Sequence, residues 1–537
     1  MRRHATIAAD SGGAGFGAAG HGAILQKIIA TLRGNALAIA IVIASLLAGA
    51  VYTWFAGEDA NWDWQNYHEY NVWAVLHGRY AIDVLPAGFQ SYFNPVVYLP
   101  VYTLRHLLPP PFGMAIMGAI HALNLALIVV FSRVLLREQA STVAVAAAVL
   151  IAACGPMTVS EVGTSFSDIL TALPIVGGLC LILAADGSQR LHYLLAGLLL
   201  GASVGLKLTN VVFALGAAAA VLLSGRAWLA TIWLALGGVA GALATGGAWS
   251  LMLWRDMGNP IFPLFNGVFR SKELAPNNIM DLQFMPEGIR DALAYPYYWL
   301  LGDNRSSEYP FRDARFALAM LLPLLGIVAR LARRAAVFTR SDLQLLVFFA
   351  ASYAAWLGLF SIQRYAIVLE LLCGPLIVLL IVRIMAPFSA RAVQAGAIGV
   401  AVAIALWSQP GDWSRRPWSD PYRPAIPAQL QSAATYFLMD KPLGYVAPLL
   451  PPRSRFYQIA DVALPIKLDG TFDRRIRAGL ADPLPGGTWE LHIRGKPFRE
   501  QLLDRYDLVV DDTKACVEIE GVQPATAITA CPLIRQK

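Results

Sequence analysis

The sequence predicts a polytopic α-helical membrane protein with a small C-terminal α/β domain. Of its 537 residues, 57% are hydrophobic and only 14% are charged, which is too apolar for a soluble globular protein. Apolar runs near membrane-spanning length recur along the chain, separated by short basic or aromatic connections. The net charge of +7 is modest, and no Lys/Arg-rich tract with interleaved aromatics occurs. We therefore expect a bilayer and no nucleic acid among its partners.

Hydropathy predicts about eleven spans within a membrane domain at 35–408. Two regions are less regular, because Lys207 interrupts 190–224 and the run at 140–157 is short. An even number of spans would return the C-terminal region to the cytoplasm. The predicted spans are 35–56, 114–135, 140–157, 168–185, 190–207, 208–224, 227–254, 314–336, 342–362, 364–385 and 390–408.

Positive charge predicts the orientation in a bacterial-type inner (cytoplasmic) membrane. Residues 1–34, which read as a disordered tail, carry basic residues before the first span, so the N-terminus is expected in the cytoplasm. The outside parts then include the loops 57–113 and 255–313, the segment around Glu161–Asp168 and the region 409–537. Each inside connection is basic, through Arg133, Arg137, Arg190, Arg226, Arg330, Arg333, Arg334, Arg340, Arg383 and Arg391.

The region 409–537 has a different composition and is interpreted as an extracytoplasmic α/β domain. It opens on a linker rich in Pro and Trp. The segments 444–451 and 506–512 are predicted to be buried strands, and 474–480 and 498–505 to be short helices. About 125 residues are enough for one hydrophobic core.

The first outside loop holds five carboxylates among tryptophan and tyrosine side chains. Tyr67, Tyr70 and Ala74 share one face of a helix, which predicts an amphipathic helix at the membrane surface. An anchoring loop with solvated acids is the alternative to a reaction site. The carboxylates are Glu58, Asp59, Asp63, Glu69 and Asp83.

Short motifs in this loop carry a resemblance to a known family. Asp63 is followed at four residues by Tyr67, then by Gly78 and by Asn94-Pro95 before the second span. This arrangement resembles the GT-C superfamily of membrane glycosyltransferases, whose particular branch the motifs do not identify. The resemblance implies that a sugar passes from a polyprenyl-phosphate donor to a lipid, glycan or protein acceptor on the outer face.

Such a reaction needs a base for the acceptor hydroxyl, and a carboxylate can supply it. Asp63 matches the position of the family's acid and is the first candidate catalytic residue, with Asp59 the second. Glu58 and Tyr67 are candidate substrate-binding neighbours. Glu58, Asp59 and Asp63 could alternatively hold a divalent metal, since hard cations take oxygen ligands, but no fixed ligand spacing supports this.

The leaving phosphate needs a cation. Lys207 lies in an apolar stretch, at a cost of about 2.5–3.5 kcal/mol by insertion scales, so we expect it to bind substrate. Snorkelling of its ammonium group to the interface is the alternative. Arg364-Tyr365 resembles an Arg-Tyr pair that many GT-C members carry, and Arg can fork onto phosphate. An ordinary boundary arginine is the alternative there.

Two other function classes stay open at this point. A transporter or flippase of lipid-linked glycans should show internal repeats and interrupted helices at the midplane. No repeat is visible, and the acids gather in one loop. A non-catalytic envelope assembly protein would tolerate the loss of every acid in that loop.

The positions of the five cysteines bear on the predicted membrane topology. Cys154, Cys180 and Cys373 lie in predicted spans and act as small apolar residues. Cys516 and Cys531 lie in the predicted outside domain, an oxidising compartment, so a disulfide between them is expected. The alternative is a pair of core cysteines in a cytoplasmic domain, which requires an even number of spans.

Overall fold

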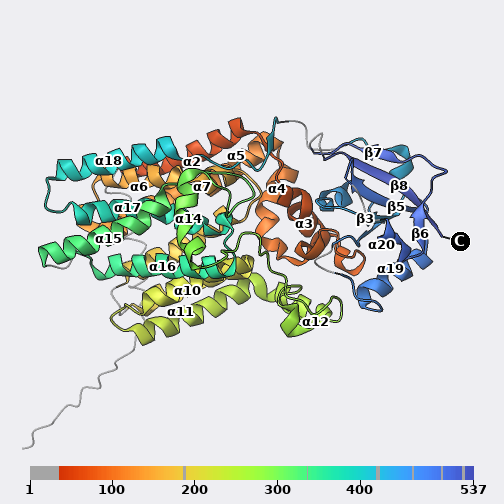
Figure 1. The fold of residues 1–537 in the computed structure, drawn as a ribbon, viewed down its shortest axis with the longest axis horizontal. Helices are drawn as coiled ribbons and strands as arrows, with labels where there is room; N and C mark the ends of the chain where they lie inside the picture. The colour runs from red at the N-terminus through yellow and green to blue at the C-terminus, as the bar shows by residue number, and fades with distance from the viewer. Residues whose placement is uncertain are drawn as a thin grey trace, which may run out of the picture.

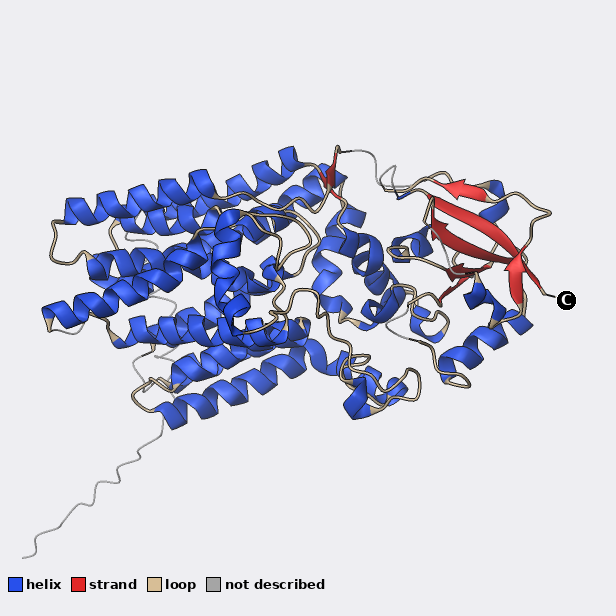
Figure 2. Ribbon diagram, in the orientation of Figure 1, coloured by secondary structure: helices blue, strands red, loops and turns tan. Residues whose placement is uncertain are grey.

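The computed structural model describes residues 36–185, 189–334, 337–418, 424–461, 465–496, 500–522 and 526–536. The predicted N-terminal tail at 1–34 lies outside these residues. Figure 1 shows a helical bundle at one end, a layer of short helices in the middle and a β-sheet domain at the other end. Figure 2 shows that strands are confined to this second end, apart from a short ribbon at the junction.

Every apolar run predicted from the sequence forms a helix of the bundle. Among the described residues, seven helices are long and apolar enough to cross a membrane, so a multi-pass membrane protein is confirmed. The runs at 142–153, 168–184, 190–206 and 208–221 form shorter apolar helices, and the count of eleven spans stays a prediction. The bundle comprises α2 (Ala36–Ala56), α5 (Pro110–Leu136), α6 (Thr142–Ala153), α8 (Asp168–Ala184), α9 (Arg190–Leu206), α10 (Val211–Val221), α11 (Ala227–Ala242), the π-helix η7 (Leu243–Gly247), α12 (Ala248–Met257), α15 (Arg315–Arg333), α16 (Arg340–Leu359), α17 (Ile367–Ile384) and α18 (Ala390–Trp407).

Helix α17 lies at the centre of the bundle. It is apolar apart from Glu370 near its start and Arg383 near its end, and 94% of its spanning window is buried, as expected of a helix surrounded by other helices. Helices α9 and α11 approach each other closely through glycines. A Cβ at Gly201 would lie 1.9 Å from the carbonyl oxygen of Gly238. Small residues permit such backbone contact in membrane bundles, where dispersion replaces the hydrophobic effect as the driving force.

The loop 57–113, which is expected to lie outside and is called the first outside loop here, forms a layer between the bundle and the sheet domain (Figure 1). Its helix α3 (Glu69–Leu76) is buried from Glu69 to Ala74, so the face with Tyr70 and Ala74, which was predicted to contact the membrane surface, packs inside the protein. The reason is that the C-terminal domain packs on it: a Cβ at Gly444 would lie 3.4 Å from the Cβ of Tyr70 in α3 and would collide with the carbonyl oxygen of Asn66 just before the helix. The other elements of the layer are β1 (Glu58–Asp59), the π-helix η1 (Trp64–His68), the 3-10 helices η2 (Arg79–Ala81), η3 (Gly88–Tyr92) and η4 (Pro95–Tyr98), and α4 (Leu99–Leu107).

The long loop at 255–313 contains two short helices, α13 (Asn266–Phe269) and α14 (Ile289–Leu301). Ile289, Leu293, Tyr297 and Leu301 recur every four residues along α14 and are exposed. This spacing places an apolar stripe on one side of the helix, as expected for a helix lying against lipid.

The C-terminal domain contains a sheet of six described strands in the order β4-β3-β5-β8-β6, with β7 also paired to β8. Strand β3 runs parallel to β4 and β5, and β8 runs antiparallel to its neighbours. Two helices pack with the sheet, α19 (Thr471–Ala481) and α20 (Gln501–Asp504). The strands are β3 (Thr435–Leu438), β4 (Arg455–Gln458), β5 (Thr488–Ile493), β6 (Leu508–Val510), β7 (Val517–Ile519) and β8 (Ile528–Arg535).

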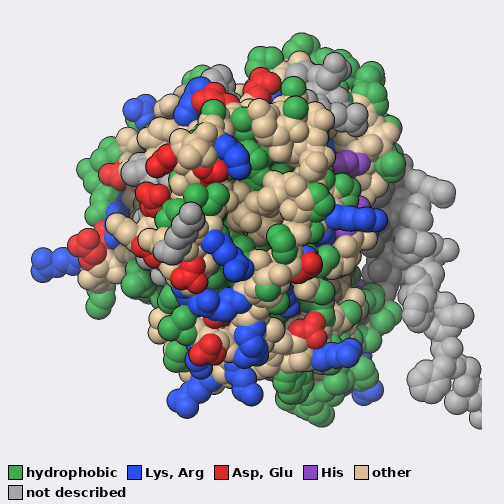
Figure 3. All heavy atoms as spheres, turned by 90° about the vertical axis from the view of Figure 1, so that its right-hand side faces the viewer, with side chains coloured by type: hydrophobic (Ala, Val, Ile, Leu, Met, Phe, Trp, Pro, Cys, Tyr) green, Lys and Arg blue, Asp and Glu red, His purple; other side chains and the backbone are tan. Residues whose placement is uncertain are grey.

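The prediction of a strand at 444–451 is wrong, because Gly444–Leu449 forms the 3-10 helix η10. Pro448 cannot donate to a strand ladder, which disfavours a central strand here. The strand expected at 506–512 is present as β6. On the face of the molecule in Figure 3, Lys and Arg side chains are interspersed with Asp and Glu.

A short ribbon ties the linker to the first outside loop. Strand β2 (Arg415–Arg416) pairs antiparallel with β1, which places Glu58 opposite Arg416 and Asp59 opposite Arg415. The chain that leaves the bundle after α18 therefore returns to the start of the first loop before it enters the sheet domain.

Candidate active site

Asp63 and Arg364 meet at the junction of the bundle and the middle layer. Asp63 is the residue before η1, and Arg364 lies in the 3-10 turn that precedes α17. Arg364 Nη1 donates to Asp63 Oδ2 at 3.2 Å, and both residues are buried. A pair removed from bulk water interacts more strongly than a surface pair, but its charges also cost more to desolvate.

Lys207 and Asp168 extend this pair into a chain of alternating charges. Lys207 ends α9 with an extended backbone, and its Nζ donates to Asp168 Oδ1 at 2.6 Å. The other carboxylate oxygen of Asp168 lies 3.8 Å from Arg364 Nη1. Lys207 is therefore partly buried with its ammonium group paired to an acid, which favours a place in this cluster over snorkelling to the interface.

Aromatic rings hold both cations. The guanidinium of Arg364 lies 4.5 Å from the ring centre of Phe166, and Lys207 Nζ lies 4.7 Å from that of Tyr365. Contacts of this kind favour the charged forms and restrict where the cationic groups can move. Tyr365 was expected to bind substrate. In the structure its ring contacts Lys207, which was also expected to bind substrate.

Glu308, from the loop between α14 and α15, is the third acid at Arg364. Its Oε1 accepts from Arg364 Nη2 at 3.4 Å, and 37% of its side chain is exposed. Asp63, Asp168 and Glu308 therefore surround one guanidinium, with Lys207 as the second cation. The acids outnumber the cations in this cluster.

The surroundings of Asp63 change its acidity. Burial raises the pKa of the Asp63 carboxyl above its ordinary value, and the charge of Arg364 opposes this shift. The carboxyl is consequently a stronger base than an exposed aspartate. Burial likewise raises the pKa of Tyr67, one helical turn away, so its phenol stays protonated.

His68 lies beside this cluster and is buried. Its ring stacks on Tyr98 with 4.2 Å between the ring centres, and its Nδ1 lies 2.9 Å from Ser165 Oγ. Burial lowers the pKa of the imidazole, and the nearby cations lower it further. His68 is therefore neutral and fixes the position of η1 against the loop before α8.

Asp59 and Glu58 do not join this cluster. Asp59 accepts hydrogen bonds from the backbone and side chain of Asn61 and from the backbone N–H of Ser165. Glu58 lies between Arg105 at 3.0 Å and Arg416 at 2.6 Å. Both carboxylates tie the first outside loop to neighbouring segments, which is a structural arrangement.

The three acids that could have formed a metal site face different partners. Across the described ranges, no group of three or more His, Cys, Asp or Glu residues has an arrangement that could hold a metal ion. The geometry therefore does not support the divalent-metal alternative for Glu58, Asp59 and Asp63.

The structure brings together Asp63, Tyr67, Lys207, Arg364 and Tyr365 and separates them from Glu58 and Asp59. Sequence reasoning missed Asp168, Glu308 and His68 as members of the site. An acid at the start of an apolar run, as in Ser167-Asp168, was the available signal for Asp168. Nothing in the local sequence distinguishes Glu308 from other loop acids.

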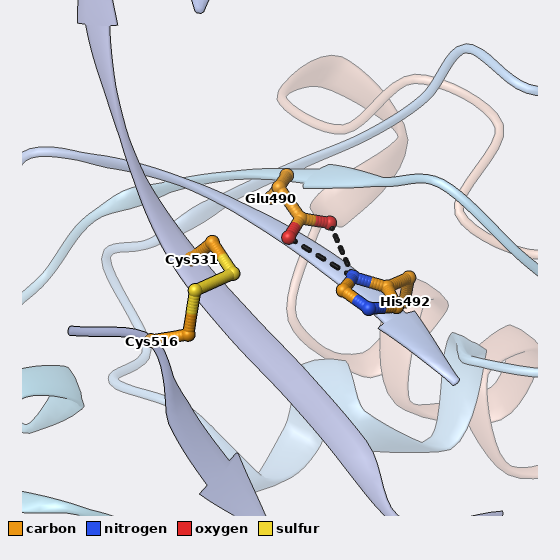
Figure 4. The surroundings of a disulfide bond; sticks show 4 residues. All are labelled: Glu490, His492, Cys516 and Cys531. Carbon is orange, nitrogen blue, oxygen red and sulfur yellow. Dashed lines mark hydrogen bonds and ion pairs between the residues drawn. A yellow bond between two sulfur atoms is a disulfide. The ribbon is translucent and has the colours of Figure 1, made fainter. Parts of the chain in front are cut away.

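Cys516 and Cys531 form a disulfide in the structure, with 4.2 Å between their Cα atoms. It joins β8 to the segment before β7. Figure 4 shows Glu490 and His492 of β5 nearby, with both Glu490 oxygens 3.0 Å from His492 Nδ1. The bond thus cross-links the part of the sheet that follows α20.

Comparisons with known proteins give one family match and two structural ones. Residues 92–263 match the model of glycosyltransferase family 87. ArnT from Cupriavidus metallidurans, solved bound to undecaprenyl phosphate, is 11% identical, with 92% of this chain and 97% of that chain covered and a TM-score of 0.41. The Archaeoglobus fulgidus oligosaccharyltransferase, tethered with an acceptor peptide, is 12% identical, with 78% and 64% covered and a TM-score of 0.39. No curated protein matches in sequence.

Proposed function

We propose that this chain, a membrane glycosyltransferase of the GT-C superfamily, transfers a sugar from a polyprenyl-phosphate donor to an acceptor on the outer face of the inner membrane. The observation that carries the proposal is the contact of Asp63 with Arg364, which is linked through Asp168 to Lys207. One base and two cations are what transfer from a phosphate-linked sugar requires. The match to a glycosyltransferase model favours an enzyme over a transporter or an assembly protein.

The reaction is a single displacement at the anomeric carbon. The acceptor oxygen forms the new bond to this carbon while the bond to the phosphate oxygen breaks, and the electron pair leaves with the polyprenyl phosphate. Asp63 takes the proton of the acceptor hydroxyl. Arg364 and Lys207 stabilise the negative charge of the departing phosphate.

The basic loops support the orientation that this proposal needs. Arg333 donates to the carbonyls of Arg383 and Ile384, and Arg383 contacts Asp342. These loops thus gather at one end of the bundle, and Figure 1 shows the sheet domain beyond the other end. Positive loops favour the cytoplasm, so the site and the C-terminal domain would lie outside. The disulfide favours the same compartment.

The test is glycan analysis of the cell envelope. Cells that lack the protein would be complemented with the wild type, with Asp63→Asn or with Asp281→Asn, an exposed loop acid of matched chemistry. We expect one sugar linkage to disappear without the protein and to return with the wild type and Asp281→Asn only. Restoration of that linkage by Asp63→Asn, at equal protein levels in the membrane, would refute the role of Asp63 as base.

A further inference from the structure

A cavity lies on the other side of η4 from the candidate active site. Its volume is about 700 Å³, within the range of about 300–1,000 Å³ that is usual for small-molecule sites. Its walls come from the first outside loop, from η7 and α12 at the end of a membrane helix, and from the start of α19 in the C-terminal domain. Glu273 of the loop 255–313 completes the wall, so four parts of the chain that are distant in sequence form the cavity.

The short helix η4 lies between this cavity and the active site. Val96 of η4 lines the cavity, while Tyr98 of the same helix stacks on His68 beside Asp63. Asn94 fixes this wall, because its Nδ2 donates to the carbonyls of Gly205 and Thr245 at 2.8 Å and 3.0 Å. The cavity and the active site thus share a wall that is held by both α9 and η7.

One side of the cavity is aromatic. Tyr80 packs edge-on against Trp249 with 5.3 Å between the ring centres, and Trp249 Nε1 donates to the carbonyl of Tyr92 at 3.0 Å. Tyr92 and Phe472 also line the cavity. Fixed aromatic faces of this kind suit the C–H face of a sugar ring, which is flat and apolar while its hydroxyls point sideways.

Charged groups lie around the same cavity. Arg475 Nη1 donates to the carbonyls of Tyr80 and Asp83, both at 2.9 Å, and a guanidinium has five donors in total. Glu273 Oε2 accepts from the backbone of Phe472, and Asp256 is exposed at the cavity. Two carboxylates and one guanidinium would repel a polyphosphate, but they can hydrogen-bond a neutral polyhydroxyl ligand.

The cavity also borders the membrane helix. Ala244, Ala248 and Met252 line it on the helix that runs from Ala227 to Met257, whose apolar length suits a bilayer. Leu251 and Trp254 of this helix do not line the cavity and are more than 60% exposed. A ligand here would therefore have an apolar part at the level of the helix and a polar part toward the C-terminal domain.

We propose that this cavity binds the saccharide of a lipid-anchored acceptor. The sugar rings lie against Tyr80 and Trp249, and Asp256, Glu273 and Arg475 bind the hydroxyls. The end of the saccharide that carries the reacting hydroxyl extends past η4 toward Asp63. This inference rests on the proposed glycosyl transfer and adds to it the class and the place of the acceptor.

A thiol-protection experiment tests the binding without any transfer. Ala248→Cys places a thiol at the cavity, and Leu251→Cys places a control thiol on the same helix outside it. The full chain in lipid nanodiscs would be labelled with a maleimide in the presence of hexyl glucoside, hexyl galactoside, hexyl mannoside, hexyl maltoside or hexanol. The unsubstituted protein gives the background from the native free cysteines.

We expect at least one hexyl glycoside to slow labelling of Ala248→Cys several-fold, with no effect on Leu251→Cys and none from hexanol. Addition of Trp249→Leu should remove this protection. Equal protection by hexanol would mean an apolar lipid pocket, and no protection by any glycoside would mean no saccharide site; either overturns the proposal. The protection of Ala248→Cys should be the same when Asp63→Asn is added, because labelling measures binding and not sugar transfer. A failure of the proposed transfer reaction can therefore be told apart from a failure of saccharide binding.

Discussion

The carboxylate of Asp63 lies 3.2 Å from the guanidinium of Arg364, although 301 residues separate them in sequence. This contact joins the first outside loop to the turn before α17. Because Arg364 also lies 3.8 Å from Asp168, which binds Lys207, the proposed base and both proposed phosphate ligands already belong to one cluster without substrate. Such preorganisation lowers the reorganisation that a reaction requires.

Asp63→Asn is expected to reduce sugar transfer by about 100- to 10,000-fold, the usual contribution of a general base. The amide keeps the shape of the side chain but cannot take the proton. Initial rates in membranes measure the effect. Asp59→Asn is the matched comparison: Asp59 accepts from Asn61 and Ser165, so its loss should lower thermal stability rather than the rate per folded molecule. The opposite pattern would move the base to Asp59.

The rate should depend on pH through Asp63. Its pKa is raised by burial, and the base is the ionised form, so the rate falls as pH drops through a value above the ordinary 3.8. Arg364 opposes the shift, so Arg364→Gln should move this acid limb to higher pH. Rate–pH profiles of both proteins measure the change. An unchanged midpoint would mean that Asp63 does not control the acid limb of the rate–pH profile.

The same shift affects stability in a defined direction. The folded state holds the Asp63 proton more tightly than the unfolded state does. Its contribution to stability is therefore present below the unfolded pKa and is lost as pH rises through the folded pKa. At neutral pH the Asp63 carboxyl therefore lowers the free energy of unfolding, and active sites often contain groups with such shifted pKa values.

Arg364→Lys is expected to raise the KM for the donor by about 10- to 100-fold, equivalent to a lost charge-assisted hydrogen bond of about 1.5–3 kcal/mol. Lysine keeps the charge but not the fork that matches phosphate. Donor titrations at saturating acceptor measure this. Arg494→Lys, at an exposed ion pair, is the control and should leave the KM unchanged. A rise in the acceptor KM alone would contradict the assignment to phosphate.

Much of the bundle could be predicted because apolar length is a local property of the sequence. The first outside loop could be located in the same way, but the burial of its helix α3 could not. That burial depends on η10 of the C-terminal domain, where Gly444 contacts the backbone at Asn66. No local pattern encodes a contact between segments so far apart.

The candidate site was predicted in part for a similar reason. Asp63 and Arg364 were predicted from the resemblance of their motifs to a known family, and Lys207 was predicted because it is a cation in an apolar run. Glu58 and Asp59 have the same appearance in sequence as Asp63. In the structure they form the ribbon with β2, and the Asp59 carboxylate accepts a hydrogen bond from the backbone of Ser165. Only the direction of each side chain separates the two groups.

Loss of the disulfide should loosen the C-terminal domain. Cys516 and Cys531 are 15 residues apart, and closing such a loop contributes about 3 kcal/mol in the chain-entropy model. Limited proteolysis of Cys516→Ser/Cys531→Ser should therefore cut this domain faster than in the wild type. In intact cells, an impermeant maleimide should label the wild type only after reduction. Persistent shielding from the reagent would place the domain in the cytoplasm.

Glu308→Gln should strengthen donor binding. Asp63, Asp168 and Glu308 all face Arg364, so an incoming phosphate competes with three acids for one guanidinium. Displacing Glu308 from Arg364 costs the least free energy, because Glu308 is the most exposed of the three acids.

Removing its charge should lower the donor KM several-fold, most clearly at low salt, since screening weakens the repulsion. Glu308 also raises the pKa of Asp63, so the acid limb of the rate should move to lower pH. The two shifts have one cause and should appear together. A higher donor KM in Glu308→Gln would instead mean that Glu308 contacts the substrate, and the cluster would then bind donor through an acid as well as through its cations.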